Sequence, residues 1–378
     1  MNRYLFIIIL LICIKIEAQT SVLDAADNFY ATGNYSKAIE HYQKYDKPVE
    51  VFEKLAKSYF ALGNYGEAIN YYKKALEAHP DNVLLKFDFA KLLYNMKKYK
   101  EASSLFEQLV DTDDTNPNYQ YEWGQSLEAL GDSTALKYYR KAFEIDKTHQ
   151  KAIYKIARHY LIERNHDVSL KYIDIGLESY ANNVELISLK AQNYYWIPDY
   201  RESAKWFEKL IELGESSQFI HESLSFCYAQ HYDYKKAVEQ GLLALQYDGK
   251  NFKNLFIQGQ LYEGLEDFAK AEEYMALALE IRDVPLDDEY RRLGYVLNRQ
   301  GKHKEAIEAL QKSLKINPNN SMSQFYLLMA KDKYYKDVGT RLKLYEDFKE
   351  KNPKHGYDFW IERRIKELKE EKFFNTED

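Results

Sequence analysis

The chain has 378 residues, of which 30% are charged, and its formal net charge is −6. Acidic and basic residues are interleaved along the chain, a pattern typical of solvated helix faces. The sequence lacks a basic stripe that could neutralise a row of phosphates, which argues against a nucleic-acid ligand. It also lacks the Walker loop, the Gly-x-Ser-x-Gly elbow and the dinucleotide fingerprint, so it predicts neither an enzyme nor a bound cofactor.

The N-terminal segment has the pattern of an export signal. Arg3 precedes an apolar run from Tyr4 to Ile14, and Ala18 supplies a small residue before Gln19. The run is too short to span a bilayer comfortably. We therefore expect residues 1–18 to be a cleaved signal peptide and the mature protein to be exported, whether periplasmic, envelope-associated or secreted. The alternative is that the segment is retained as an anchor, which would be the protein's contact with a membrane.

A ladder of small residues runs the length of the mature chain. Successive members stand 30 to 35 positions apart. They are Ala38, Ala68, Ala102, Ala135, Ser169, Ser203, Ala237, Ala271, Ala306 and Thr340. A fixed period in this range predicts a solenoid, in which each repeat is one supersecondary unit that buries its apolar face against its neighbours. We expect this solenoid to occupy residues 19–355.

The second repeat shows what each unit contains. Apolar residues at three- and four-residue spacing lie on both sides of a turn at Gly63 and Asn64. Ala56 stands before this turn and Ala68 after it, each followed within about one helical turn by a tyrosine, and Pro80 closes the unit. This pattern predicts two amphipathic helices joined as a hairpin.

A small residue and an aromatic in the first helix, a Gly turn, an Ala and an aromatic in the second, and a closing Pro together resemble the tetratricopeptide repeat family. The resemblance covers nearly the whole mature chain and is closest to the exported bacterial type. It implies an all-α, right-handed solenoid of about ten helical hairpins, whose inner, concave wall is formed by the exposed faces of the first helices.

Two further registers predict how the hairpins pack. The first helices carry a small residue once per repeat, at Ala26, Ala56, Ala90, Gly124, Ala157, Ala191, Ser225, Gly259 and Gly294. Four residues beyond the small site of the second helix, large residues such as Tyr139, Met275 and Leu310 recur. Backbones approach closely only where a side chain is nearly absent, so we expect close helix contacts at the small sites and a core built from the large residues. The tenth repeat departs from the pattern, with Leu328 at its small site.

A capping helix is expected after the last hairpin, in a segment of residues 356–378 that ends in a short tail. Between Tyr357 and Lys372, apolar residues such as Ile361 and Leu368 alternate with charged ones. The end repeat of a solenoid needs an amphipathic lid with a polar outer face to stay soluble. A helix that docks a partner is the alternative interpretation.

The exposed face of each first helix is the candidate binding site. Counted from the small sites, this face carries Phe87, Tyr94, Tyr121, Tyr154, Arg158, Tyr195, Trp196, Phe226, Phe256, Arg291, Tyr295 and Arg299. Aromatic rings and arginines suit a peptide-binding surface, because rigid rings bury much area at little entropic cost. We therefore predict a non-enzymatic protein–protein interaction scaffold that binds an extended peptide or another protein in its concave groove.

Other interpretations of this wall stay open. The same aromatic residues suit a glycan or a small molecule, and many of the 35 tyrosines can pack between helices instead. Arg158, Arg291 and Arg299 favour an anionic peptide over a neutral sugar, because guanidinium groups pair with carboxylates.

One segment partly copies a calcium-binding loop. Asp111, Asp113, Thr115 and Glu122 match some of the oxygen-ligand positions, but Asn116 stands where the loop needs a Gly for its sharp bend. The segment is rich in residues that stop and start helices. We interpret it as a linker between repeats, and the sequence predicts no metal site.

Overall fold

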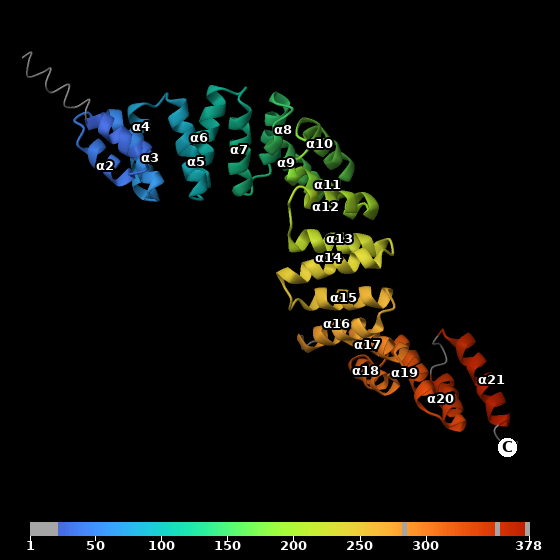
Figure 1. Cartoon of the computed structure of the whole chain (residues 1–378). Coiled ribbons are helices and arrows are strands. Elements are labelled where there is room, and N and C mark those ends of the chain that lie inside the picture. The colour runs from blue at the N-terminus through green and yellow to red at the C-terminus, as the bar shows by residue number, and fades with distance from the viewer. Residues whose placement is uncertain (1–21, 282–285, 352–355, 375–378) are drawn as a thin grey trace, which may run out of the picture. The chain divides into compact units, whose positions relative to one another are not determined.

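The computed structural model describes residues 22–281, 286–351 and 356–374, and every regular element among them is an α-helix. The predicted signal peptide lies outside the described residues. The chain divides into two compact units, Met1–Ala181 and Asn182–Asp378. The all-α solenoid expected from the sequence is confirmed, because helical hairpins follow one another through each unit (Figure 1).

The first unit consists of consecutive hairpins that each pack against the next. Its helices are residues 22–31, α2 (Tyr35–Gln43), α3 (Pro48–Ala61), α4 (Tyr65–Ala78), α5 (Val83–Asn95), α6 (Tyr99–Thr112), α7 (Pro117–Ala129), α8 (Ala135–Ile145), α9 (Gln150–Ile162) and α10 (His166–Ser179). Odd-numbered labels from α3 mark the first helix of a hairpin, and even-numbered labels mark the second.

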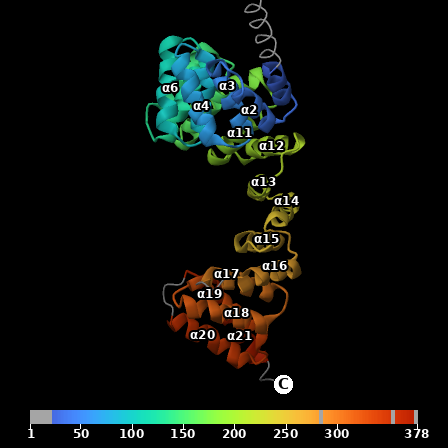
Figure 2. The same cartoon turned by 90° about the vertical axis from the view of Figure 1, so that its left-hand side faces the viewer.

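The second unit continues the same alternation and ends in a single helix. Its helices are α11 (Val184–Trp196), α12 (Tyr200–Glu212), α13 (Gln218–Gln230), α14 (Tyr234–Tyr247), α15 (Phe252–Gly264), α16 (Phe268–Ile281), α17 (Asp287–Arg299), α18 (His303–Ile316), α19 (Ser321–Tyr334), α20 (Val338–Lys351) and α21 (Asp358–Phe374). Helices α13 to α16 lie side by side in chain order in Figure 1, and Figure 2 shows α17 to α21 packed as a group.

In each described hairpin before the one formed by α19 and α20, one residue of the turn has a positive φ. Gly63 takes this position in the second repeat with φ of 76°, a conformation that glycine adopts without steric cost. The side chain of Asn64 then accepts a hydrogen bond from the backbone N–H of Glu67 at 3.3 Å and caps α4. In the third repeat, Lys97 occupies the same turn position with φ of 58°.

The small residues of the first helices face large residues of the second helices. A Cβ placed on Gly259 would come within 2.7 Å of Cγ of Met275, and one on Gly294 within 2.5 Å of Cγ of Leu310. These glycines therefore let the two helices of a hairpin approach until the large side chain fills the space. The predicted close contact at the small sites is confirmed.

Serine at a small site adds a hydrogen bond across the hairpin. The Oγ of Ser169 donates to the carbonyl of Ala157 at 2.8 Å, and the Oγ of Ser203 donates to the carbonyl of Ala191 at 3.0 Å. Both acceptors are themselves small-site residues of the preceding first helix. A hydroxyl is tolerated in these fully buried positions because it finds a backbone acceptor.

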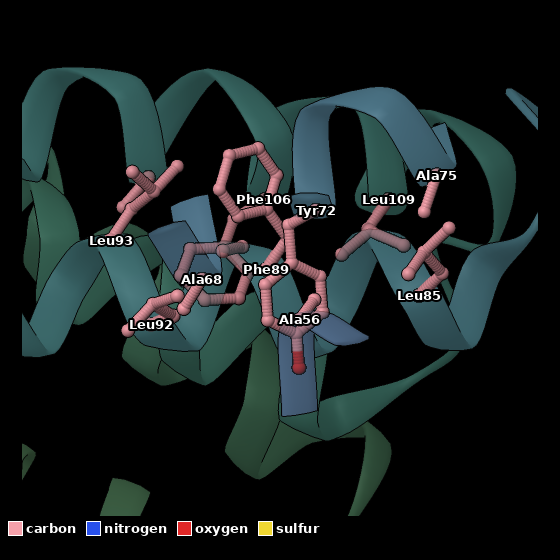
Figure 3. Packing of buried hydrophobic residues seen from close by; sticks show 12 residues of the cluster. Ala56, Ala68, Tyr72, Ala75, Leu85, Phe89, Leu92, Leu93, Phe106 and Leu109 are labelled. Atoms are coloured by element: carbon pink, nitrogen blue, oxygen red, sulfur yellow. The ribbon is translucent and has the colours of Figure 1, made fainter. Parts of the chain in front are cut away.

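The large residues of the repeat form the core, as expected. In the first unit Tyr72 stacks on Phe89 with ring centroids 5.5 Å apart, and Phe106 is fully buried beside them. Ala56 and Ala68 belong to the same cluster, and their small side chains leave room for the rings (Figure 3).

A pair of aromatic rings recurs at the hairpin turn. The last turn of the first helix and the first residue of the second each contribute one ring, five residues apart in sequence. Such pairs are Tyr30 with Tyr35, Phe60 with Tyr65, Tyr94 with Tyr99, and Tyr195 with Tyr200, at centroid distances of 5.4, 5.8, 5.3 and 5.9 Å. Their tilted and edge-to-face geometries are those that aromatic pairs prefer.

Helix α21 covers the last hairpin, as a capping helix should. Ile361 and Leu368 are fully buried against apolar residues of α19 and α20, whereas Arg363, Lys366 and Glu370 are exposed. The expected lid is present, although its exposed face is mixed, because the rings of Phe359, Trp360 and Phe373 are exposed beside the charged residues.

A buried carboxylate ties the last three helices together. Asp332 on α19 accepts hydrogen bonds from Nε of Arg341 on α20 at 2.8 Å, from Nε of Arg364 on α21 at 2.9 Å and from the Tyr345 hydroxyl at 3.2 Å. Burial alone would raise the pKa of Asp332, but the hydrogen bonds from the two arginines hold it below its ordinary value. This network stands where the tenth repeat loses its small residue, at Leu328.

Candidate protein-binding surface

The predicted site residues lie on first helices of both units. In the first unit, Phe87 and Tyr94 on α5 and Tyr154 on α9 are half-buried, and Arg158 on α9 is exposed. Tyr121 on α7 is only 6% exposed, with its ring against those of Tyr139 and His149. The expectation that Tyr121 lines an exposed wall is therefore wrong, because its neighbours on α8 and before α9 enclose it.

Ion pairs join neighbouring first helices in the first unit. Each pairs a cation with a carboxylate about one repeat away in the chain. The pairs are Lys57 with Asp88 at 3.3 Å, Lys91 with Glu122 at 2.5 Å, Lys155 with Glu128 at 2.6 Å and Arg158 with Glu128 at 4.0 Å. We refer to these pairs as the ion-pair row.

Glu128 is a carboxylate of the ion-pair row that the surrounding residues stabilise in its charged form. It accepts hydrogen bonds from Nζ of Lys155 at 2.6 Å and from the hydroxyl of Tyr139 at 2.5 Å. Burial alone would raise the pKa of Glu128, but the Lys155 and Tyr139 hydrogen bonds and the nearby Arg158 charge lower it. The negative charge of Glu128 is thus stabilised by groups of the protein itself.

The second unit carries a cluster of rings at the turn end of two hairpins. We call Tyr195, Trp196, Tyr200, Phe226 and His231 the ring cluster. Tyr195 lies at its centre, with centroid distances of 5.6 Å to Trp196, 5.9 Å to Tyr200 and 5.2 Å to Phe226. Tyr200 extends the contacts to Phe226 at 5.4 Å and to His231 at 6.4 Å.

Part of the ring cluster faces solvent. Trp196 is 51% exposed and Phe226 38%, and Ile197 beside Trp196 is also 38% exposed. Tyr195 is half-buried beneath them, and burial raises the pKa of its hydroxyl. A solvent-facing group of large apolar side chains supported by packed rings is the kind of surface that binds other molecules.

The remaining predicted residues of the second unit have other environments. Phe256 is only 8% exposed and stacks on Phe252, so its expected place on an exposed wall is wrong. The Tyr295 ring packs against Tyr326 with centroids 5.4 Å apart, and its hydroxyl accepts a hydrogen bond from Nη1 of Arg299 at 2.8 Å.

Each of the three predicted arginines already has an acidic partner. Arg158 lies 4.0 Å from Glu128 in the first unit. In the second unit, Arg291 lies 3.1 Å from Asp288, and Arg299 lies 3.8 Å from Glu266. The expected preference for an anionic peptide is therefore weakened, because each guanidinium group already has a carboxylate of the chain nearby.

Sequence reasoning missed two members of the ring cluster. Tyr200 stands five residues after Tyr195, the same offset as in the other aromatic pairs at hairpin turns. That recurring offset could have located Tyr200 from the sequence. His231, which follows α13, has no such signal.

No group of three or more His, Cys, Asp or Glu in the described part of the chain is arranged to hold a metal ion. Among the same residues, no helix combines the length and the apolar character needed to cross a bilayer.

The candidate calcium ligands have other partners. Asp113 accepts a hydrogen bond from the backbone N–H of Thr115, and Glu122 forms an ion pair with Lys91. An open pocket of about 380 Å³ lies between α5 and α6, lined by residues such as Leu93 and Leu105.

Models of the tetratricopeptide repeat match residues 59–121, 252–284 and 288–320 of this sequence. The matched segments have the hairpins, the small sites and the turn geometry described above. The chain is a tetratricopeptide repeat protein.

Named proteins similar to this tetratricopeptide repeat chain share only modest identity with it. TPR repeat-containing protein MJ1428 of Methanocaldococcus jannaschii is 25% identical over 293 residues, which cover 70% of this chain. The match covers 49% of MJ1428, so this chain spans about half the length of that relative.

Solved structures that are similar in fold have low identity and low TM-scores. YrrB, described as a TPR protein with an unusual peptide-binding site, has a TM-score of 0.47 at 18% identity, covering 50% of this chain and 96% of its own. A tetratricopeptide repeat protein from Parabacteroides merdae has a TM-score of 0.43 at 16% identity, covering 75% and 98%. Yeast Tom70 has a TM-score of 0.36 at 15% identity, covering 95% and 97%.

Proposed function

We propose that this tetratricopeptide repeat protein is a non-enzymatic scaffold outside the cytoplasm that binds an extended peptide or protein partner on the wall formed by its first helices. The family and the solenoid fold support a role in protein–protein interaction, because stacked hairpins expose long surfaces without a central catalytic cleft. The proposed location rests on the signal-like segment before Gln19.

The observation that carries the proposal is the exposed ring cluster of the second unit. Trp196 and Phe226 present large apolar surfaces to solvent. The Tyr195 ring packs against both of them, and the Tyr200 ring packs against Phe226. Rings fixed in this way lose little entropy when a partner covers them. The surface is therefore prepared for binding rather than for packing within the chain.

A photo-crosslinking experiment tests the proposal at the site itself. A benzophenone amino acid would replace Trp196 in one variant and Phe219 in a control variant, and each mature protein would be incubated with the envelope fraction of its own cell. Phe219 is a suitable control because it is 49% exposed on the same helix as Phe226 but packs against Phe207, outside the ring cluster. Recovery of one defined protein from position 196 and not from position 219 supports the proposal, and equal recovery from both positions contradicts it.

A further inference from the structure

We infer that the segment bound by the ring cluster is an uncharged stretch of extended peptide with apolar side chains, such as proline, leucine or valine. The inference rests on the proposed function and names the chemistry of the partner. It follows from how the charges of the first-helix walls are distributed in each unit and from the composition of the ring cluster.

The lysines of the ion-pair row are poorly placed to bind an anionic partner. Lys57, Lys91 and Lys155 each lie within 3.3 Å of a carboxylate of a neighbouring first helix. A carboxylate of a partner would have to displace one of these carboxylates. Displacement is most costly at Lys91, because the side chain of its partner Glu122 is only 7% exposed and would be left as a buried, unpaired charge.

The three arginines of α17 are occupied in the same way. Arg291 pairs with Asp288 at 3.1 Å, Arg292 with Glu263 at 3.3 Å, and Arg299 with Glu266 at 3.8 Å. Arg299 also lies over the Phe268 ring, 4.7 Å from its centroid. Pairs of this kind are weak one by one, yet each places a carboxylate beside a guanidinium group that would otherwise attract an anionic segment.

The ring cluster contains no Lys, Arg, Asp or Glu. Its solvent-facing members are Trp196, Phe226 and His231, and with the adjacent Ile197 they present mainly carbon atoms, together with one indole N–H and the imidazole nitrogens. A carbohydrate carries hydroxyl groups around its whole rim, and each of them needs a hydrogen-bond partner when buried. Apolar side chains on an extended peptide make no such demand, and extended proline-rich segments dock readily on aromatic grooves. The surface therefore fits an apolar peptide better than a sugar or a charged peptide.

Binding of defined probes to the mature protein tests this inference. Fluorescent peptides of three compositions would be titrated by anisotropy: a neutral set rich in Pro, Leu and Val, an acidic set and a basic set, with malto- and chito-oligosaccharides as further probes. Each titration would be made at about 50 mM and at about 500 mM NaCl, since salt screens exposed charges but leaves apolar contacts in place. Trp196→Ala and Phe226→Ala would be compared with Phe219→Ala, after circular dichroism has shown that each variant is folded.

We expect the neutral peptides to bind saturably, with an affinity that differs by less than about twofold between the two salt concentrations. Trp196→Ala and Phe226→Ala should each weaken binding by about tenfold, whereas Phe219→Ala should leave it unchanged. Trp196 is more exposed than Phe226, so the Trp196→Ala variant alone tests the inference if Phe226→Ala does not fold.

Several outcomes would overturn the inference. Tighter binding of acidic or basic peptides with strong salt dependence would mean that the paired charges are available after all, and the scaffold function would stand with a different partner. Binding of oligosaccharides without binding of peptides would remove both the inference and the proposed function. If no probe binds, the inference fails, while specific crosslinks from position 196 would still support the scaffold.

Discussion

The ring of Tyr139 occupies the space that a side chain at Gly124 would need. A Cβ on Gly124 would lie 2.9 Å from Cε1 of Tyr139 and 3.2 Å from the carbonyl oxygen of Ala135. The ring has little freedom to move away, because it is only 3% exposed and its hydroxyl donates to Glu128 at 2.5 Å. The glycine is therefore required by the packing of α7 against α8.

Replacing this glycine should destabilise the first unit. We expect Gly124→Ala to lower the free energy of unfolding by about 1 kcal/mol. The destabilisation from overpacking exceeds the stabilisation that comes from the higher helix propensity of Ala. Gly66→Ala is the matched control, because Gly66 lies in α4 with only Asn64 within 4 Å, at 3.9 Å. Urea unfolding followed by circular dichroism measures both, and an equal change in the two variants would refute the packing argument.

Acid should weaken the start of α9 through His149. Its Nδ1 accepts a hydrogen bond from the backbone N–H of Ala152 at 3.1 Å and caps the helix, which a protonated ring cannot do. Burial lowers the pKa of His149, and the positive charge of Lys151 lowers it further. The negative charges of Asp146 and Glu122 raise this pKa but do not outweigh burial. The unfolded chain therefore binds the proton more readily, so this contribution to stability is lost as the pH falls below about 6.5.

The variant His149→Asn isolates this effect. Asparagine keeps a capping oxygen but does not titrate, so its stability should fall less than that of the natural protein between about pH 7 and about pH 5. Thermal unfolding at several pH values gives the comparison, and the expected difference is at most about 1 kcal/mol. Parallel curves for the two proteins would show that His149 does not contribute.

The turn at Lys97 should be improved by glycine. Lys97 is exposed and has φ of 58°, a conformation that costs a side chain about 1 kcal/mol. Lys97→Gly should therefore raise the free energy of unfolding by about 0.5 to 1 kcal/mol. Lys100→Gly, in the first turn of α6, is the control and should lower it by up to about 1 kcal/mol. Stabilisation by both substitutions, or by neither, would contradict the backbone argument.

Removal of the Asp332 carboxylate should loosen the C-terminal helices. Asp332→Ala leaves Arg341 and Arg364 without the carboxylate that neutralises them, and the expected loss is about 3 kcal/mol. Hydrogen exchange should accelerate in α20 and α21 while α13 and α14 remain protected. Glu362→Gln removes an exposed partner of Lys349 and should change nothing measurable. Uniform acceleration throughout the second unit would argue against a local role for Asp332.

The fold could be predicted because the features that define it are local and periodic. Each hairpin contains its own small sites, its own turn, such as the one at Gly63, and its own large residues. The separation of these residues in the sequence therefore indicates which of them are in contact. The departure at Leu328 was visible too, but the network around Asp332 was not. Its arginines come from two other helices, and no period relates them to Asp332.

The candidate site was predicted less completely, because exposure depends on neighbours that a helical register does not reveal. Tyr121 and Phe256 occupy the same register as Phe87, yet both are buried. The His149 ring before α9 covers Tyr121, and the Phe252 ring of the same helix covers Phe256. The acidic partners of Arg158 and Arg299 lie on a preceding repeat or in its turn, thirty or more residues away. Charge pairing across repeats therefore had to be seen in space.

The hydroxyls of Ser169 and Ser203 reach carbonyl groups twelve positions earlier in the chain, and both bonds stay inside a single hairpin. A gene segment encoding one whole hairpin could therefore be duplicated or lost without stranding either partner of such a bond. An insertion between the serine and its carbonyl would separate them at once. These bonds therefore permit the length of the protein to change in steps of one repeat, whereas the ion pairs between neighbouring first helices do not come away unbroken when a hairpin is lost.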